Sequence, residues 1–167
     1  FGSAEDKIDA VSLVDFENGL PKKELLLRDI HATNSGRLSI FDLIHRTLSL
    51  EPEESPDLWH GNDVEPLLNE MASAFPTFNA GDLAISYRHL NLVYIVDPEA
   101  LQIKWWAQSR TSGQHDIDWQ YDGTVTVFDN RNDREGDYST IVKFRPPDDM
   151  PEVVFDGRDY NFSSGHA

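Results

Sequence analysis

The sequence predicts a mainly β fold, a partial β-propeller of about three blades of four-stranded antiparallel sheet, with one short helix near residues 39–49. Two observations lead to this prediction. After residue 58 the apolar side chains fall into short runs separated by turn sequences, which is typical of sheet proteins. A set of four such runs then occurs twice, each time after a histidine, at a period close to that of propeller blades.

The N-terminal part is predicted to contain a hairpin followed by the helix. Residues 10–16 (AVSLVDF) and 24–28 (ELLLR) are predicted strands, and the Asn-Gly pair between them favours a tight turn. Residues 39–49 place apolar side chains near helical spacing, with Ser39 as a candidate cap. An acidic linker with two prolines follows at residues 51–57.

The rest of the chain is predicted to form two sets of four strands. The first set comprises residues 63–67, 82–88, 92–97 and 103–108, and the second comprises residues 116–120, 124–129, 138–144 and 152–156. His60 and His115 precede the two sets and His166 stands at the end of the chain, so that these three histidines are spaced 55 and 51 residues apart. This spacing is that of a repeated blade.

The chain is therefore predicted to be a single partial propeller segment, residues 1–167. It is divided into an incomplete blade with the helix at 10–50, blades at 58–110 and 111–160, and the start of a further blade at 161–167. Because a propeller closes with about four to eight blades, we expect the missing blades to come from the same polypeptide or from other copies in a homo-oligomer. The sequence begins at Phe1, as expected if a leader has been removed or the chain trimmed.

Composition excludes several classes of function. The net charge is −16, with 30 acidic against 14 basic residues, which disfavours non-specific binding of nucleic acid or of anionic lipid. The chain has no cysteine, so disulfides and thiol catalysis are excluded. No apolar run approaches the roughly 20 residues of a membrane span, so no membrane association is predicted.

The candidate catalytic residues are His115, His60, Asn62 and Arg88. The first strand of each propeller blade lines the central channel, so residues at the starts of these strands converge although they lie far apart in sequence. Arg88 ends the second strand of its blade and is expected at the same mouth. An arginine fork binds oxyanions, histidine acts as nucleophile, acid or base, and an asparagine amide can donate to developing negative charge.

Each of these side chains also has a structural interpretation. A histidine at a strand start is often a packing residue, but the recurrence of His60 and His115 at matching blade positions puts a function on an equal footing with packing. Arg88 can instead pair with one of the many carboxylates, and His89 is expected on the opposite face. No role can be assigned to His166. A structural role is expected for His31, His45, Trp105 and Trp106.

No cofactor or metal is predicted. The loop at residues 129–137 (DNRNDREGD) offers carboxylates for calcium, but its spacing does not fit an EF-hand, and a charged connecting loop is the preferred interpretation. The histidines lack a zinc pattern such as His-Glu-x-x-His. The sequence also contains neither a Gly-rich phosphate loop nor a Gly-x-Ser-x-Gly elbow.

Three stretches of the chain resemble the bacterial arylsulfotransferases, a family of propeller enzymes. They are residues 60–67 (HGNDVEPL), residues 81–91 (GDLAISYRHLN) with the following Val-Asp-Pro, and residues 112–116 (SGQHD) leading to residues 127–130 (VFDN). The resemblance implies a periplasmic or secreted enzyme that transfers a sulfuryl group from an aryl sulfate ester to a phenolic acceptor. The transfer runs through a sulfohistidine and does not use the nucleotide sulfate donor PAPS.

The resemblance also implies roles for individual residues. His115 matches the nucleophile, His60 and Asn62 match a His-x-Asn pair, and Arg88 matches an arginine that clamps the sulfate. Two departures are evident: a further histidine of the family has no match here, and Asp116 stands where the best-known members have threonine. The alternatives are a non-catalytic propeller module that binds a ligand or partner protein, and a hydrolase in which water takes the sulfuryl group.

Overall fold

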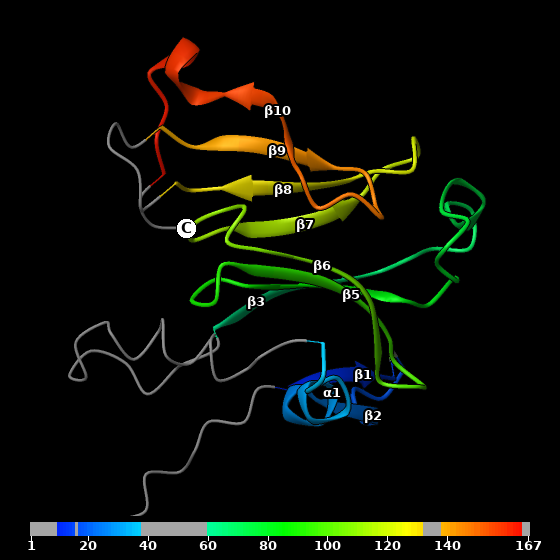
Figure 1. Cartoon of the computed structure of the whole chain (residues 1–167). Coiled ribbons are helices and arrows are strands. Elements are labelled where there is room, and N and C mark those ends of the chain that lie inside the picture. Colours follow the sequence, from blue (N-terminus) through cyan, green and yellow to red (C-terminus); the bar gives the residue numbers. More distant parts are fainter. Residues whose placement is uncertain (1–9, 16, 38–59, 132–137, 165–167) are drawn as a thin grey trace, which may run out of the picture.

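The structure is a computed structural model and describes residues 10–15, 17–37, 60–131 and 138–164. These residues form ten strands in three antiparallel sheets, two of four strands and one of two, together with one short α-helix (Figure 1). The predicted mainly β class is therefore confirmed, and the open sheets are consistent with a partial propeller. The helix expected near residues 39–49 lies outside the described residues.

The two four-stranded sheets follow the chain in simple meanders. The first sheet has the order β3 (Gly61–Pro66), β4 (Leu83–Tyr87), β5 (Leu92–Asp97) and β6 (Gln102–Gln108). The second sheet runs from β7 (His115–Trp119) through β8 (Val125–Asp129) and β9 (Thr140–Phe144) to β10 (Glu152–Asp156). All eight predicted strands are present, and β5 and β10 have the predicted bounds. The predicted division into blades and a further unit after residue 160 stays a prediction.

The N-terminal hairpin is confirmed, but its second strand ends earlier than expected. β1 (Ala10–Val14) pairs with β2 (Pro21–Leu26), and α1 (Leu27–Thr33) begins where the sequence predicted strand to continue to residue 28. Leu27, Ile30 and His31 bury one face of α1, and no side chain caps its N-terminus. A helix of seven residues is marginal alone, so tertiary packing decides its formation.

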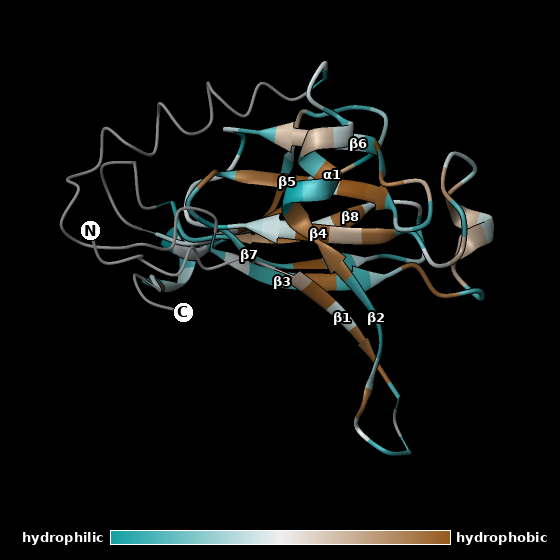
Figure 2. Cartoon of the chain, turned by 90° about the horizontal axis from the view of Figure 1, so that it is seen from below, coloured by the Kyte–Doolittle hydropathy of each residue, from teal (hydrophilic) through white to brown (hydrophobic). Residues whose placement is uncertain are grey.

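The first sheet is covered on both faces. One apolar cluster, to which Leu67, Val93, Trp105, Val127 and Phe144 belong, fills the space between the two four-stranded sheets. A second cluster packs the other face of the first sheet against β2 and α1. Figure 1 shows the second sheet, the first sheet and the hairpin with α1 succeeding one another from top to bottom. In Figure 2 the apolar segments follow the strands, and the tip of the β1–β2 hairpin projects from the molecule.

Hydrogen bonds of a buried asparagine fix α1 to the first sheet. Asn34, just after the helix, donates from Nδ2 to the carbonyl oxygen of Leu101 at 2.6 Å and accepts at Oδ1 from the amide of Ile103 at 3.0 Å. Within the described ranges, no helix is both long and apolar enough to cross a bilayer.

Candidate functional site

The first strands of the two sheets, β3 and β7, lie side by side. Asn62 Nδ2 donates to the carbonyl oxygen of Gln114 at 2.8 Å, and the amide of Ile117 donates to Asp63 Oδ2 at 2.7 Å. These bonds run from side chains of β3 to the backbone at the start of β7. We call β3 and β7, the first strands of their sheets, the inner strands. The two strand starts that carry the candidate histidines are therefore held next to each other.

The backbones of His60 and Arg88 are in contact just before the first residue of β3. The amide of Arg88 donates to the carbonyl oxygen of His60 at 3.0 Å, and His60 has a left-handed backbone with φ of 47°. The ring of His60 stacks on that of His89, with centroids 4.5 Å apart and planes at 29°. The expectation that His89 lies on the face opposite to Arg88 stays a prediction, but its ring lies against the candidate residue His60, just beyond the end of β4 at Tyr87.

The structure places Asn62 against the segment that carries His115. Its partner Gln114 directly precedes His115, which begins β7. The four candidates thus fall into two groups, His60 with Arg88 and Asn62 with the His115 segment. The two groups are connected through β3, since only Gly61 separates His60 from Asn62.

His60 and His115 do not occupy matching positions of the two sheets. Gly61 pairs with Tyr87, His115 pairs with Phe128, and each inner strand has a bulge directly afterwards. His115 therefore corresponds to Gly61, and the predicted match of the two histidines is wrong by one residue. Sequence spacing alone shows neither the bulges nor the register.

Buried polar groups that the sequence did not single out hold the backbone before His115. Gln114 is 0% exposed and donates from Nε2 to the carbonyl oxygens of Tyr87 at 2.8 Å and Leu92 at 3.2 Å. The amide of Gly113 donates to Asn91 Oδ1 at 2.8 Å. The turn after β4 thus fixes the loop that precedes β7.

The imidazole of His115 itself is contacted by a second asparagine. Asn130 Nδ2 lies 3.2 Å from His115 Nδ1 and donates to the carbonyl oxygen of Gly113 at 2.8 Å. Sequence reasoning assigned no role to Asn130. The only signal was its place in the Val-Phe-Asp-Asn stretch at residues 127–130.

The guanidinium of Arg88 has capacity for an anion. In the described part of the chain, Arg88 Nε is buried without a hydrogen-bond partner, and no carboxylate lies within salt-bridge distance of this side chain. Asn62 Oδ1 is likewise buried without a partner among these residues. The alternative that Arg88 pairs with a carboxylate is therefore not observed there.

Carboxylates crowd the same two strands. Partial burial raises the pKa of Asp63, Glu65 and Asp118 above the usual carboxyl value, and repulsion among them and Asp116 raises it further. The first strands of the two sheets therefore carry a strongly negative cluster beside His115.

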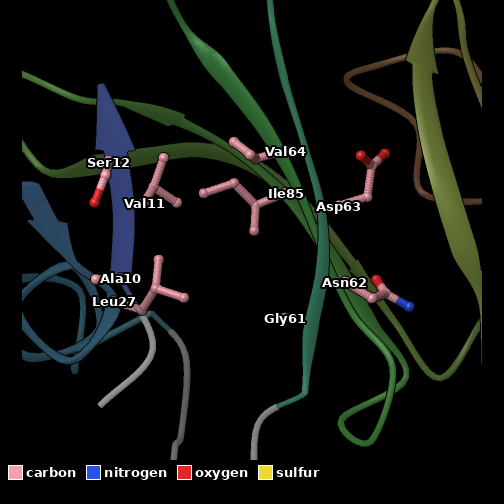
Figure 3. Close-up of a pocket in the computed structure, with 9 residues that line it drawn as sticks. All are labelled: Ala10, Val11, Ser12, Leu27, Gly61, Asn62, Asp63, Val64 and Ile85. Carbon is pink, nitrogen blue, oxygen red and sulfur yellow. The ribbon is translucent and has the colours of Figure 1, made fainter. Parts of the chain in front are cut away.

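A cavity of about 400 Å³ lies on the other side of β3, between this strand and the N-terminal hairpin (Figure 3). Val11, Leu27 and Ile85 contribute apolar side chains, whereas the side chains of Asn62 and Asp63 point away from β1. None of His60, Arg88 and His115 lines this cavity. It is therefore not the place where the candidate groups meet.

Three further predictions concern a metal ion, the acidic loop and the buried tryptophan Trp105. Among the described residues, no three His, Asp or Glu side chains are arranged to hold a metal ion. Residues 132–137 of the acidic loop, His45 and His166 lie outside the described ranges. Trp105 is buried against Phe144, with ring centroids 5.5 Å apart, which confirms its packing role.

Comparison with known proteins identifies one family. The model of the arylsulfotransferase (ASST) family matches residues 45–147, a range that includes all four candidate residues. No curated protein and no solved structure matches the chain.

Proposed function

Because the chain belongs to the arylsulfotransferase family, we propose that it transfers a sulfuryl group from an aryl sulfate ester to a phenolic acceptor through a sulfohistidine at His115. In the first step a ring nitrogen of His115 forms a bond to sulfur while the bond from sulfur to the aryl oxygen breaks, and the phenolate leaves. In the second step the acceptor phenolate attacks sulfur, the nitrogen–sulfur bond breaks, and the imidazole is regenerated. The reaction as written needs no cofactor.

The observation that supports this proposal most is the guanidinium of Arg88 in a chain of net charge −16. Its Nε is buried without a partner among the described residues, so a donor remains for a sulfate oxygen. The backbone of Arg88 bonds to His60, and Asn62 bonds next to His115. The backbone segments that carry Arg88 and His115 are thus linked through β3.

We assign the remaining candidates to the sulfate oxygens. Arg88 clamps the sulfuryl group, and His60 donates to an oxygen on which negative charge develops. Asn62 uses one amide hydrogen for the carbonyl oxygen of Gln114 and has a second for the substrate. We further propose a periplasmic or secreted location, with other blades supplied by the same polypeptide or by other copies.

One observation favours the alternative of a non-catalytic propeller module. Asn62 already fastens β3 to the start of β7 through its bond to Gln114, which is a structural role. The carboxylates beside His115 also oppose the approach of an anionic aryl sulfate. In that alternative the same surface binds a ligand or a partner protein without transferring a group.

The experiment incubates the intact protein with 4-nitrophenyl sulfate, with and without a phenol acceptor. We expect nitrophenol release that depends on the acceptor. Release without any acceptor indicates hydrolysis by water, and the absence of release supports the binding module.

Three variants assign the residues in this assay. We expect His115→Asn to abolish transfer and Arg88→Gln to lower kcat/KM by roughly 100-fold or more, the range for loss of a charged transition-state donor. Arg28→Gln removes an equal charge from an exposed arginine and serves as the matched control, with transfer unchanged. Equal activity of His115→Asn and wild type would contradict the assignment.

A further inference from the structure

The Val-Phe-Asp-Asn stretch ends in a side chain for which the proposed function has no role. Asn130 directly follows β8 and is 3% exposed. Its amide nitrogen reaches both the carbonyl oxygen of Gly113 and the ring of His115. The buried amide of Asn130 therefore determines whether the nearby nitrogen of the His115 ring donates or accepts a hydrogen bond.

The orientation of the Asn130 amide follows from its contact with the backbone. The carbonyl oxygen of Gly113 can only accept, so the atom 2.8 Å away must be the amide nitrogen. The opposite orientation would place two oxygens against each other. Asn130 Oδ1 is left buried and without a partner among the described residues, so the contacts of Nδ2 alone fix the amide.

This orientation specifies the tautomer of His115. Nδ2 carries two hydrogens, one for Gly113 and one for His115 Nδ1 at 3.2 Å, so the ring nitrogen accepts. A neutral imidazole that accepts at Nδ1 carries its proton on Nε2. A protonated ring would instead direct an N–H group at the N–H of Asn130.

In the first sheet, the residue that corresponds to Asn130 also contacts a histidine. Gly61 pairs with Tyr87 and His115 pairs with Phe128, so His89 and Asn130 each lie two residues beyond the pairing partner and correspond to each other. His89 also lies against an imidazole at the start of an inner strand, that of His60. In each sheet, the second residue beyond the pairing partner therefore contacts a histidine at the start of the first strand (His115) or directly before it (His60).

We propose that Asn130 is a positioning residue that holds His115 in the Nε2–H tautomer, so that the resting imidazole offers a hydrogen-bond donor at Nε2. The catalytic meaning of this assignment rests on the proposed function. Attack on sulfur by Nε2 needs a lone pair there, so the Nε2 proton must pass to water and Nδ1 must take up a proton before the nitrogen–sulfur bond forms. Asn130 thus favours the donor form of His115 over its nucleophilic form.

The test is a nitrogen-15 spectrum of the histidine rings of the intact, substrate-free protein, with the His115 signals assigned by their loss in His115→Asn. We expect the Nε2–H tautomer in wild type. In Asn130→Asp a carboxylate accepts from Nδ1–H, so we expect the ring proton at Nδ1 and a titration midpoint about one pH unit higher. The exposed Asn69→Asp introduces the same charge elsewhere and is expected to leave the His115 signals unchanged.

If Asn130→Asp does not fold, the nitrogen-15 spectrum of the wild-type protein still decides the tautomer of His115. Asn130→Ala provides a second variant, which introduces no buried charge. In Asn130→Ala we expect a higher midpoint, because the imidazolium no longer meets the amide hydrogen. A proton on Nδ1 in wild type, or a folded Asn130→Asp protein with wild-type His115 signals, would overturn the proposal. These spectra need no substrate, so a protein that transfers no sulfuryl group but shows the expected tautomer would refute only the proposed function.

Discussion

At the scale of single residues, the most unusual environment is that of His31 on α1. Its side chain is 0% exposed, and its ring meets those of Tyr87 and Tyr94 edge-on, with centroids 5.7 and 5.8 Å away. Burial lowers the pKa of His31 from 6.5 to about 4. The histidine therefore folds as a neutral core residue, which agrees with the structural role that the sequence predicted.

This pKa shift predicts how stability depends on pH. As the pH falls below about 6.5, the unfolded chain takes up the His31 proton before the folded protein does, so stability is full above that pH and decreases towards pH 4. The slope from this one group is at most about 1.4 kcal/mol per pH unit. The free energy of unfolding in urea, measured at about pH 7 and about pH 5, checks this expectation.

The variant His31→Leu isolates this effect from all other titrating groups. We expect wild type to lose about 2 kcal/mol more than the variant between pH 7 and pH 5. An identical loss in both proteins would show that His31 is not the group responsible.

At the scale of elements, β3 and β7 are adjacent strands that bring carboxylates together. Desolvation and mutual repulsion raise the pKa of Asp63, Glu65 and Asp118. A raised pKa means that the folded protein binds these protons more readily than the unfolded chain does. Their contribution to stability therefore improves as the pH falls, opposite in sign to that of His31.

Removal of one of these charges should stabilise the fold near neutral pH. We expect Asp118→Asn to raise the free energy of unfolding by about 0.5 kcal/mol at low ionic strength, and less in high salt, because it relieves repulsion between neighbouring strands. Urea unfolding at two salt concentrations measures this difference. Glu70→Gln removes an equal charge from an exposed side chain and is the control. A destabilised Asp118→Asn protein would contradict this account of the strand pair.

The elements also show which features a sequence can predict. Strands β3 to β10 could be predicted because strand alternation and turn residues are local signals. Helix α1 could not, because it has no side-chain cap and forms through contacts of Leu27 and Ile30 with distant strands. The role of Asn130 could not be predicted either, since its partners lie 15 and 17 residues earlier and depend on the register of β7 with β8.

At the scale of the whole molecule, a shared core joins the two four-stranded sheets. Trp119 is 7% exposed, its ring lies 4.8 Å from that of Phe75, and its Nε1 donates to the carbonyl oxygen of Glu65 at 3.0 Å. Side chains from both sheets contribute to the same apolar cluster. The strand starts that carry Asn62 and His115 can keep their relative position only while this core is intact.

The shared core predicts a large effect from one substitution. We expect Trp119→Ala to lower the free energy of unfolding by about 3–5 kcal/mol, since it removes a buried aromatic side chain and an inter-sheet hydrogen bond. Tyr121→Ala removes a side chain that is 73% exposed and should change stability by no more than about 0.5 kcal/mol. Equal effects of the two substitutions in urea unfolding would mean that the sheets do not depend on a common core.

The most direct test of the proposed activity is to map the covalent intermediate. The intact protein is incubated with 4-nitrophenyl sulfate without acceptor, digested at alkaline pH, and its peptides are analysed by mass spectrometry. The account predicts one sulfuryl group on His115, absent from His115→Asn and removed when a phenol is added. Transfer to the phenol while His115 stays unmodified, or a sulfuryl group that persists after the phenol is added, would contradict it.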